Sequence, residues 1–204
     1  MKIIAEVRNG QLTNTIPEIG GLTKYSVHRP FEKTLDATTE HPDEVTGIAM
    51  IWLHDGASVD LQSWFPDCET HAYRVDESVL VDYSRAWPDG IVSPGVRRIS
   101  FIKAKPELTR TEMARHWHDE HWPLARVHHP KLWRYVQNVV VEPVTAQTPE
   151  VDAIAELHFV TLDDLENHFY DSDAGREIVA ADVEKFIDRG AGWRIVAQET
   201  WLKS

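Results

Sequence analysis

An internal repeat constrains the fold of this 204-residue chain more than any single motif does. Segment 47–53 (GIAMIWL) parallels segment 153–159 (AIAELHF), and each is followed by a segment that ends in aromatic side chains. Upstream of these segments, Tyr25 and Tyr135 lie in two further segments that resemble each other. Each half therefore has the order tyrosine strand, apolar strand, helix, which is typical of a duplicated unit.

The second half contains a complete unit in the order strand, helix, strand, strand, helix, strand, which is the ferredoxin-like order βαββαβ. The two halves meet in segment 87–95 (WPDGIVSPG), where two prolines and two glycines interrupt any periodicity. We therefore predict a degenerate half over 1–94, with too few residues before Tyr25 for the first helix, and a complete half over 95–204. Paired face to face, two such α+β halves would form a dimeric α+β barrel around a cavity.

A helix from Thr109 to about His128 places a histidine on a face that should be buried. Thr109 and Glu112 form a capping box, which marks the start of the helix. Its apolar and aromatic positions recur at spacings of three and four, so they form one stripe: Met113, Trp117, His121, Leu124 and His128. We therefore predict that His121 points inward, either as a hydrogen-bonded core residue or as a catalytic group.

Composition excludes several classes of partner. The formal charge of −12, without a cluster of Lys or Arg, argues against nucleic acid and against an anionic membrane surface. No apolar run approaches membrane-spanning length, and the N-terminal apolar segment is too short for a signal peptide. The single cysteine, Cys68, excludes an internal disulfide framework. We expect a soluble cytoplasmic protein.

Alternation along the strand 153–159 predicts which side chains line the cavity. Ala155 and Leu157 suit the face under the helices, whereas Glu156 and His158 fall on the barrel interior. A carboxyl group among apolar walls has its ionised form disfavoured unless it is paired. Glu156 is therefore either a catalytic acid or partner of His121, or a structural carboxylate bonded to a neighbouring strand.

The second half resembles the EthD family of dimeric α+β barrel proteins. The resemblance rests on the helix pattern Trp117-x-x-x-His121, on the strand 134–138 (RYVQN), on DAIAE at 152–156 and on DVEKF at 182–186. It implies a barrel fold more firmly than a reaction. Members of the family include decarboxylases of aromatic polyketide acids and small proteins linked to ether degradation, and more distant barrels include cofactor-free oxygenases and haem-degrading enzymes.

The remaining candidate residues would shape a pocket for a flat aromatic ligand. Tyr135 and Gln137 share a strand face and would orient a substrate carboxylate or carbonyl, with His158 as a further binding residue. The helix would add Trp117 and His118. The first half would add an apolar wall, or the same side chains would only pack in the core: Tyr25, Met50, Trp52 and Trp64.

The sequence gives little support for a metal site, a cofactor site or a catalytic nucleophile. His118 and His121 lie three residues apart, but the chain has no His-Glu-x-x-His motif and no set of cysteine ligands, so we expect no metal. We expect no cofactor either, because the chain has no glycine-rich phosphate loop or nucleotide fingerprint. It also has no Gly-x-Ser-x-Gly nucleophile motif.

These observations and the resemblance lead us to favour a cofactor-independent lyase, specifically a decarboxylase of an aromatic or polyketide-like small molecule. His121 would act as general acid, or as base in a related elimination. Glu156 would set its tautomer or share its proton, and Tyr135 would hold the substrate. The alternatives are a cofactor-free monooxygenase and a non-catalytic binding protein of a catabolic pathway. We expect a homodimer, although the tandem halves could also complete the barrel within one chain.

Overall fold

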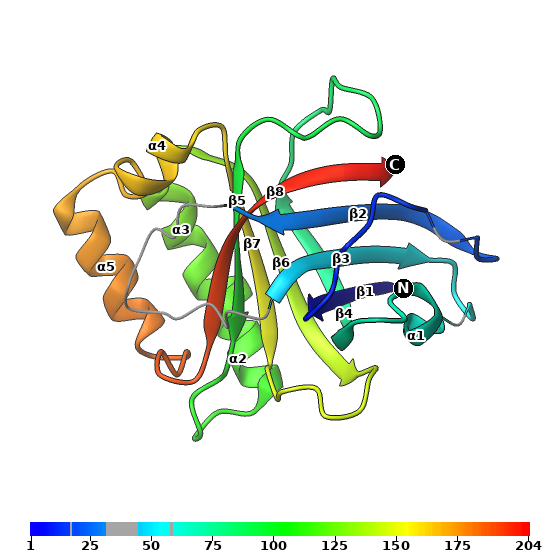
Figure 1. Cartoon of the computed structure of the whole chain (residues 1–204). Helices are drawn as coiled ribbons and strands as arrows, with labels where there is room; N and C mark the ends of the chain where they lie inside the picture. The colour runs from blue at the N-terminus through cyan, green and yellow to red at the C-terminus, as the bar shows by residue number, and fades with distance from the viewer. Residues whose placement is uncertain (17, 32–44, 58) are drawn as a thin grey trace.

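The computed structural model describes residues 1–16, 18–31, 45–57 and 59–204, and it shows one closed barrel of eight strands (Figure 1). Neighbouring strands follow the order β1-β3-β2-β8-β5-β7-β6-β4, and every pairing is antiparallel. The strands are β1 (Lys2–Arg8), β2 (Leu22–Pro30), β3 (Val45–Leu53), β4 (Glu69–Val81), β5 (Val96–Ile102), β6 (Leu132–Pro143), β7 (Ala153–Phe159) and β8 (Trp193–Lys203).

The helices are short and lie mostly on one side of the barrel (Figure 1). The first half contributes only α1 (Leu61–Trp64) among the residues described. The second half contributes α2 (Arg110–His116), the π-helix η1 (Trp117–His121), α3 (Trp122–His128), α4 (Leu162–Glu166) and α5 (Asp173–Val183). None of these helices is long and apolar enough to span a bilayer.

The expected α+β class, with two ferredoxin-like repeats forming a dimeric α+β barrel, is wrong. The protein is a closed antiparallel β-barrel with few helices, and all eight strands come from one chain. The reason is that the halves join edge to edge, β2 to β8 and β4 to β6, instead of stacking two separate sheets face to face. Closure pairs both edges of every described strand.

Side chains fill the barrel interior, so the cavity expected between the two halves is absent from the part of the chain that is described. An apolar cluster occupies part of the interior, with Ile4, Met50, Ile99 and Ile154 each fully buried. Strand parity was predicted correctly for β7, because Glu156 is buried with partners on the inward side while Ala155 packs among the residues beneath the helices. Interior positions are therefore core positions.

A network of charged side chains occupies the rest of the interior. Lys2 Nζ donates hydrogen bonds to Glu156 Oε1 at 2.7 Å, to Glu77 Oε1 at 2.7 Å and to Asn138 Oδ1 at 2.9 Å. Lys2 is only 2% exposed and Glu156 is fully buried. Since Lys2 lies on β1 and Glu156 on β7, this contact connects the two halves through the centre of the barrel.

Two buried arginines complete the network. Arg97 contacts the carboxylate of Glu199, and it also donates to the Tyr83 hydroxyl at 3.1 Å. Arg134 Nη1 lies 3.6 Å from Glu156 Oε2 and its Nε donates to Asp82 Oδ1 at 2.8 Å. Although burial opposes ionisation, Lys2 and the two arginines hold the pKa of Glu156 well below its usual range. Glu156 is therefore an ionised, structural carboxylate.

The buried histidines of this network should make folding stability depend on pH. Burial, and next the positive charge of Arg97, keep the pKa of both His28 and His158 well below 6.5. The unfolded chain binds protons at these side chains below about pH 6.5, while the folded chain does not. Their contribution to stability is present above that pH and is lost as the pH falls, by about 1.4 kcal/mol per histidine and pH unit.

We expect urea denaturation between pH 6.5 and 5.5 to show this loss in the free energy of unfolding. The control is His158→Gln, which removes one titrating side chain from both states. The free energy of unfolding of this variant should fall less steeply with decreasing pH. The difference in slope corresponds to about one proton fewer taken up on unfolding. An identical slope for the variant and the original chain would contradict a neutral, buried His158.

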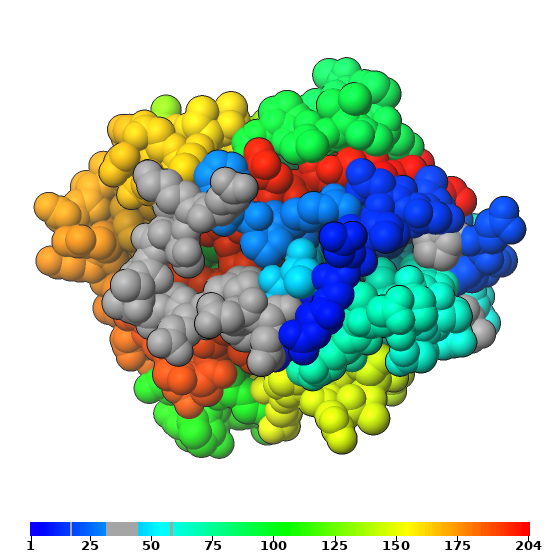
Figure 2. Space-filling view, in the orientation of Figure 1, coloured from blue at the N-terminus to red at the C-terminus, as the bar shows by residue number. Residues whose placement is uncertain are grey.

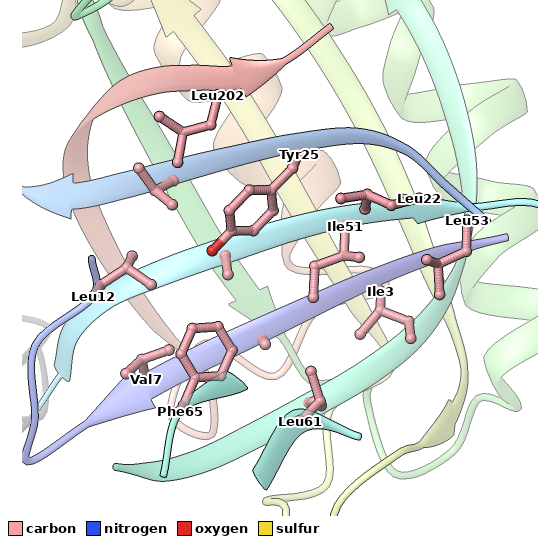
Figure 3. Packing of buried hydrophobic residues seen from close by; sticks show 14 residues of the cluster. Ile3, Val7, Leu12, Leu22, Tyr25, Ile51, Leu53, Leu61, Phe65 and Leu202 are labelled. Atoms are coloured by element: carbon pink, nitrogen blue, oxygen red, sulfur yellow. The ribbon is translucent and has the colours of Figure 1, made fainter. Parts of the chain in front are cut away.

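The outer faces of the barrel carry separate apolar cores. Over the first half, Leu12, Leu61 and Phe65 cover outward side chains of the strands, among them Ile3 and Ile51 (Figure 3). Over the second half, the helices α2 to α5 cover β5, β6 and β7, and this is where the functional candidates gather. The two outer faces are therefore separate, one over the strands of the first half and one over the strands of the second half.

Candidate functional site

The helical segment with His121 begins as the sequence predicts and then departs from a regular helix. Thr109 caps α2 with a complete capping box, in which Glu112 N–H donates to Thr109 Oγ1 at 3.2 Å and Thr109 N–H donates to Glu112 Oε2 at 2.9 Å. From Trp117 to His121 the chain forms a π-helix, and Trp122 N–H bonds to Trp117 O five residues earlier. Such π turns occur frequently at functional sites.

The π turn changes which residues face the barrel. The buried positions follow a constant spacing of four, with exposed fractions between 0% and 7%: Met113, Trp117, His121, Ala125 and His129. Leu124 and His128, which a regular spacing would place on this stripe, are only half-buried. A wider turn takes more residues, so the buried face advances by one position after His121. The inward orientation of His121 is unaffected.

His121 is oriented by a carboxylate that sequence reasoning did not find. Its Nδ1 lies 2.9 Å from Asp182 Oδ2 on α5, and Asp182 Oδ1 lies 3.1 Å from His116 Nε2 and 3.2 Å from Lys185 Nζ. Asp182 is 3% exposed. The expected pairing of His121 with Glu156 is therefore wrong, since the barrel wall separates the two side chains. The sequence does contain a signal for Asp182, because this carboxylate lies on the same helical stripe as the apolar residues Val179 and Phe186.

The protonation states of this pair follow from their surroundings. Burial lowers the pKa of His121 below its ordinary value, although the hydrogen bond and charge of Asp182 partly oppose the shift. Burial alone would raise the pKa of Asp182, but hydrogen bonds from His121, Lys185 and His116 lower it overall. Asp182 is thus ionised and accepts a hydrogen bond from Nδ1–H of a neutral imidazole. No described residue bonds Nε2, which carries the free lone pair of that tautomer.

A cavity of about 420 Å³ adjoins His121, between the helices and the outer face of the second-half strands. Aromatic and aliphatic side chains form most of its wall, which is usual for a small-molecule site. Arg98 and Ser100 from β5 and Arg194 from β8 place polar groups on its floor. Ser100 Oγ is buried without a hydrogen-bond partner among the described residues. This polar floor was not predicted from the sequence.

Further polar groups come from the helix side of the cavity. His129 Nδ1 donates to the backbone oxygen of Phe169 at 2.8 Å. Burial lowers the pKa of His129 to about 4, with a smaller opposing effect of that hydrogen bond. His129 is therefore neutral at pH 7 and offers Nε2 as an acceptor. Two neutral imidazoles, from His121 and His129, thus line the same cavity.

The predicted substrate-binding residues of the second half are distributed unevenly. Trp117 and Tyr135 line the cavity, and Trp117 Nε1 donates to the Tyr135 hydroxyl at 2.8 Å. Gln137 lies behind them, where its Nε2 donates to Trp117 O at 3.0 Å. His118 is exposed, and its Nδ1 lies 3.2 Å from Gln137 Oε1. Trp117 and Tyr135 remain candidates for substrate contact. Gln137 does not line the cavity but bonds to the backbone of Trp117, and His118 bonds to Gln137.

The other predicted residues lie away from this cavity. Glu156, His158, Met50 and Trp52 belong to the barrel interior, where Trp52 Nε1 donates to Glu77 Oε2 at 2.9 Å. Tyr25 lies on the outer face of the first half. The single apolar wall expected from Tyr25, Met50 and Trp52 is wrong because Tyr25 pairs in register with Ile51, so it shares a face with Ile51 and not with its neighbours Met50 and Trp52.

A metal centre finds no support in the positions of the side chains. Among the described residues, no group of three or more His, Cys, Asp or Glu side chains is arranged to hold a metal ion. His118 and His121, the pair that helical spacing suggested, bond to different partners.

Fold and site together define a closed antiparallel barrel with a ligand-sized cavity under the helices of its second half, next to a histidine–aspartate pair. The EthD domain model matches residues 105–190, in the half whose motifs indicated this family. A solved structure described as an anthrone oxidase-like protein has a similar fold, with a TM-score of 0.64 and 10% sequence identity over 100% of this chain and 94% of that chain. No curated protein sequence matches this chain.

Proposed function

We propose that the second-half cavity binds a small aromatic molecule and that His121 removes a proton from it as a general base. The observation that carries this proposal is the buried, neutral imidazole held through Nδ1 by Asp182 at the wall of a cavity with both aromatic and polar lining. A base needs a free lone pair at working pH, and a lowered pKa provides it. The same geometry disfavours a general acid, so it does not favour the decarboxylase that the sequence suggested.

Proton abstraction fits an oxidation better than a lyase reaction. A methylene group between aromatic rings loses a proton to yield a delocalised carbanion, which dioxygen can oxidise. With one molecule of dioxygen, the two hydrogens of the methylene leave as water and a carbonyl group forms. The anthrone oxidase-like protein of similar fold is consistent with this class of substrate. Oxidation is therefore the reaction we favour among those expected for the EthD resemblance.

Residues on the cavity floor suit the charge that would develop. The carbanion is stabilised when its charge spreads onto a ring oxygen, and Arg98 and Arg194 supply positive charge on the floor while Ser100 supplies a hydroxyl donor. The aromatic walls, including Trp117 and Tyr135, suit a flat ring system. The substrate would then lie between the arginines of the strands and the imidazole of the helix.

The test is a set of substrates assayed with and without oxygen. Anthrone-type compounds, and aromatic acids as the alternative, are incubated with the protein while oxygen uptake, carbon dioxide release and product masses are measured. We expect oxygen uptake with a product that gains one oxygen atom and loses two hydrogens, and no turnover under anaerobic conditions. Carbon dioxide release that is independent of oxygen would instead indicate a decarboxylase, and compounds recovered unchanged would indicate a binding protein.

A further inference from the structure

A second cavity, of about 570 Å³, lies on the opposite face of the barrel, over the first half. It is enclosed by the segment that follows β1 and by the segment around α1, and Figure 2 shows these two segments, dark blue and teal, beside each other on this surface. Its lining includes Thr13, Glu18, Tyr25, Asp60 and Trp64. The proposed reaction uses none of these residues.

Aromatic rings face this first-half cavity from more than one direction. The Tyr25 and Trp64 rings lie 6.0 Å apart at an interplanar angle of 78°. The Trp64 and Phe65 rings lie 6.3 Å apart at 70°. Tyr25 and Phe65 are only 1% and 5% exposed, whereas Trp64 is half-buried, so Trp64 is the ring of the three that a cation in the cavity can contact.

The Tyr25 hydroxyl is a polar group of a residue that lines this cavity. Tyr25 is 1% exposed, and no described residue forms a hydrogen bond with its hydroxyl. Figure 3 shows this oxygen pointing away from Leu22 and Leu53, toward Leu12 and Phe65. Burial raises the pKa of Tyr25 to about 12, so the group stays a neutral phenol. A hydroxyl on the cavity lining without a partner among the described residues can bond to a ligand or a water molecule there.

The charge of the lining is negative. Glu18 and Asp60 are acidic, and none of the described lining residues is Lys or Arg. Asp60 Oδ1 caps α1 by accepting from the N–H groups of Gln62 at 3.2 Å and Ser63 at 3.3 Å, so the carboxylate is held in place. The nearest arginine along β2, Arg29, donates to Leu12 O and to Asn14 Oδ1, each at 2.7 Å.

We propose that this first-half cavity binds a small organic ammonium ion. The Trp64 ring attracts a weakly hydrated cation, and the carboxylates of Asp60 and Glu18 add charge complementarity. The Tyr25 hydroxyl can exchange a hydrogen bond with a polar group on the ligand. An anion would meet two carboxylates and no lining cation, so the cavity selects against it. The two faces of the barrel thus bind ligands of opposite character.

The test uses choline as the probe and 3,3-dimethylbutan-1-ol, its uncharged carbon isostere, as the matched control. Isothermal titration calorimetry on the full chain should show choline binding at least tenfold more tightly than the isostere. Equal affinities would overturn the selection of a cation. Binding of neither probe would overturn the site.

Variants locate the binding in the cavity. Trp64→Leu should weaken choline binding at least tenfold, and Asp60→Asn, which retains an oxygen to cap α1, should weaken it several-fold without affecting the isostere. Circular dichroism confirms that each variant is folded. His121→Ala on the opposite face should leave choline binding unchanged, so that failure of this proposal and failure of the proposed reaction remain distinguishable. Choline binding that persists fully in Trp64→Leu would contradict the assignment.

Discussion

Replacing His121 with alanine is expected to lower kcat/KM for the aromatic substrate by about 10²- to 10⁴-fold, which is the usual contribution of a positioned general base. The barrel should remain folded, because His121 lies on a helix outside the barrel and contributes to none of its strands. The measurement is oxygen uptake with the substrate that shows turnover. The matched control is His168→Ala, an exposed histidine beyond the end of α4, which should retain full activity.

Asp182 should act as a positioning residue, and its role has a separate signature. The hydrogen bond and negative charge of Asp182 raise the pKa of His121 against the effect of burial. Asp182→Asn therefore lowers this pKa further, and because the base works when deprotonated, the rise of kcat/KM with pH should move to lower pH. Normal activity of His121→Ala, or an unchanged pH profile of Asp182→Asn, would contradict the base mechanism.

The largest effect on stability is expected from Lys2→Met. This change leaves Glu156 buried in the barrel without its closest positive partner, and removing one member of a buried pair costs about 3–5 kcal/mol. For a domain of this size, the melting temperature should fall by roughly 2–4 °C per kcal/mol. Thermal denaturation followed by circular dichroism measures the change. Methionine retains most of the side-chain volume, so the effect comes mainly from the charge.

Two further variants separate electrostatics from packing. Adding Glu156→Gln to Lys2→Met removes the unpaired charge, so the double variant should be more stable than Lys2→Met alone. Lys103→Met breaks pairs of a partly exposed lysine with Glu150 and Asp152, and because Asp152 keeps Arg110 as a partner, the change should cost no more than about 1 kcal/mol. If Lys2→Met and Lys103→Met had equal effects, the barrel network would not hold the halves together as described.

Local patterns predicted local features of this protein well. The capping box of Thr109 and Glu112 and the alternation along β7 each depend on residues close together in sequence, and the structure contains both. The inward orientation of His121 followed from the same kind of pattern. The EthD motifs indicated the domain that the match over 105–190 confirms.

Features that depend on distant residues were missed or wrong. The interior roles of Lys2 and Glu6 on β1 were missed, because their partners Glu156 and Trp193 lie far away in the sequence. His121 and Asp182 are 61 positions apart, so helical spacing around His121 could not reveal its partner. The edge-to-edge joining of the halves depends on the pairing of β2 with β8, which neither repeat specifies by itself.

Placing both halves in one polypeptide has an evolutionary consequence. In an assembly of two identical chains, each substitution appears on both faces of the barrel and must be tolerated in both environments. Here the face beneath α1 and the face beneath α5 are encoded by different codons, so a substitution on one face leaves the other unchanged. Only the shared interior, where Lys2 meets Glu156, requires the two halves to change together.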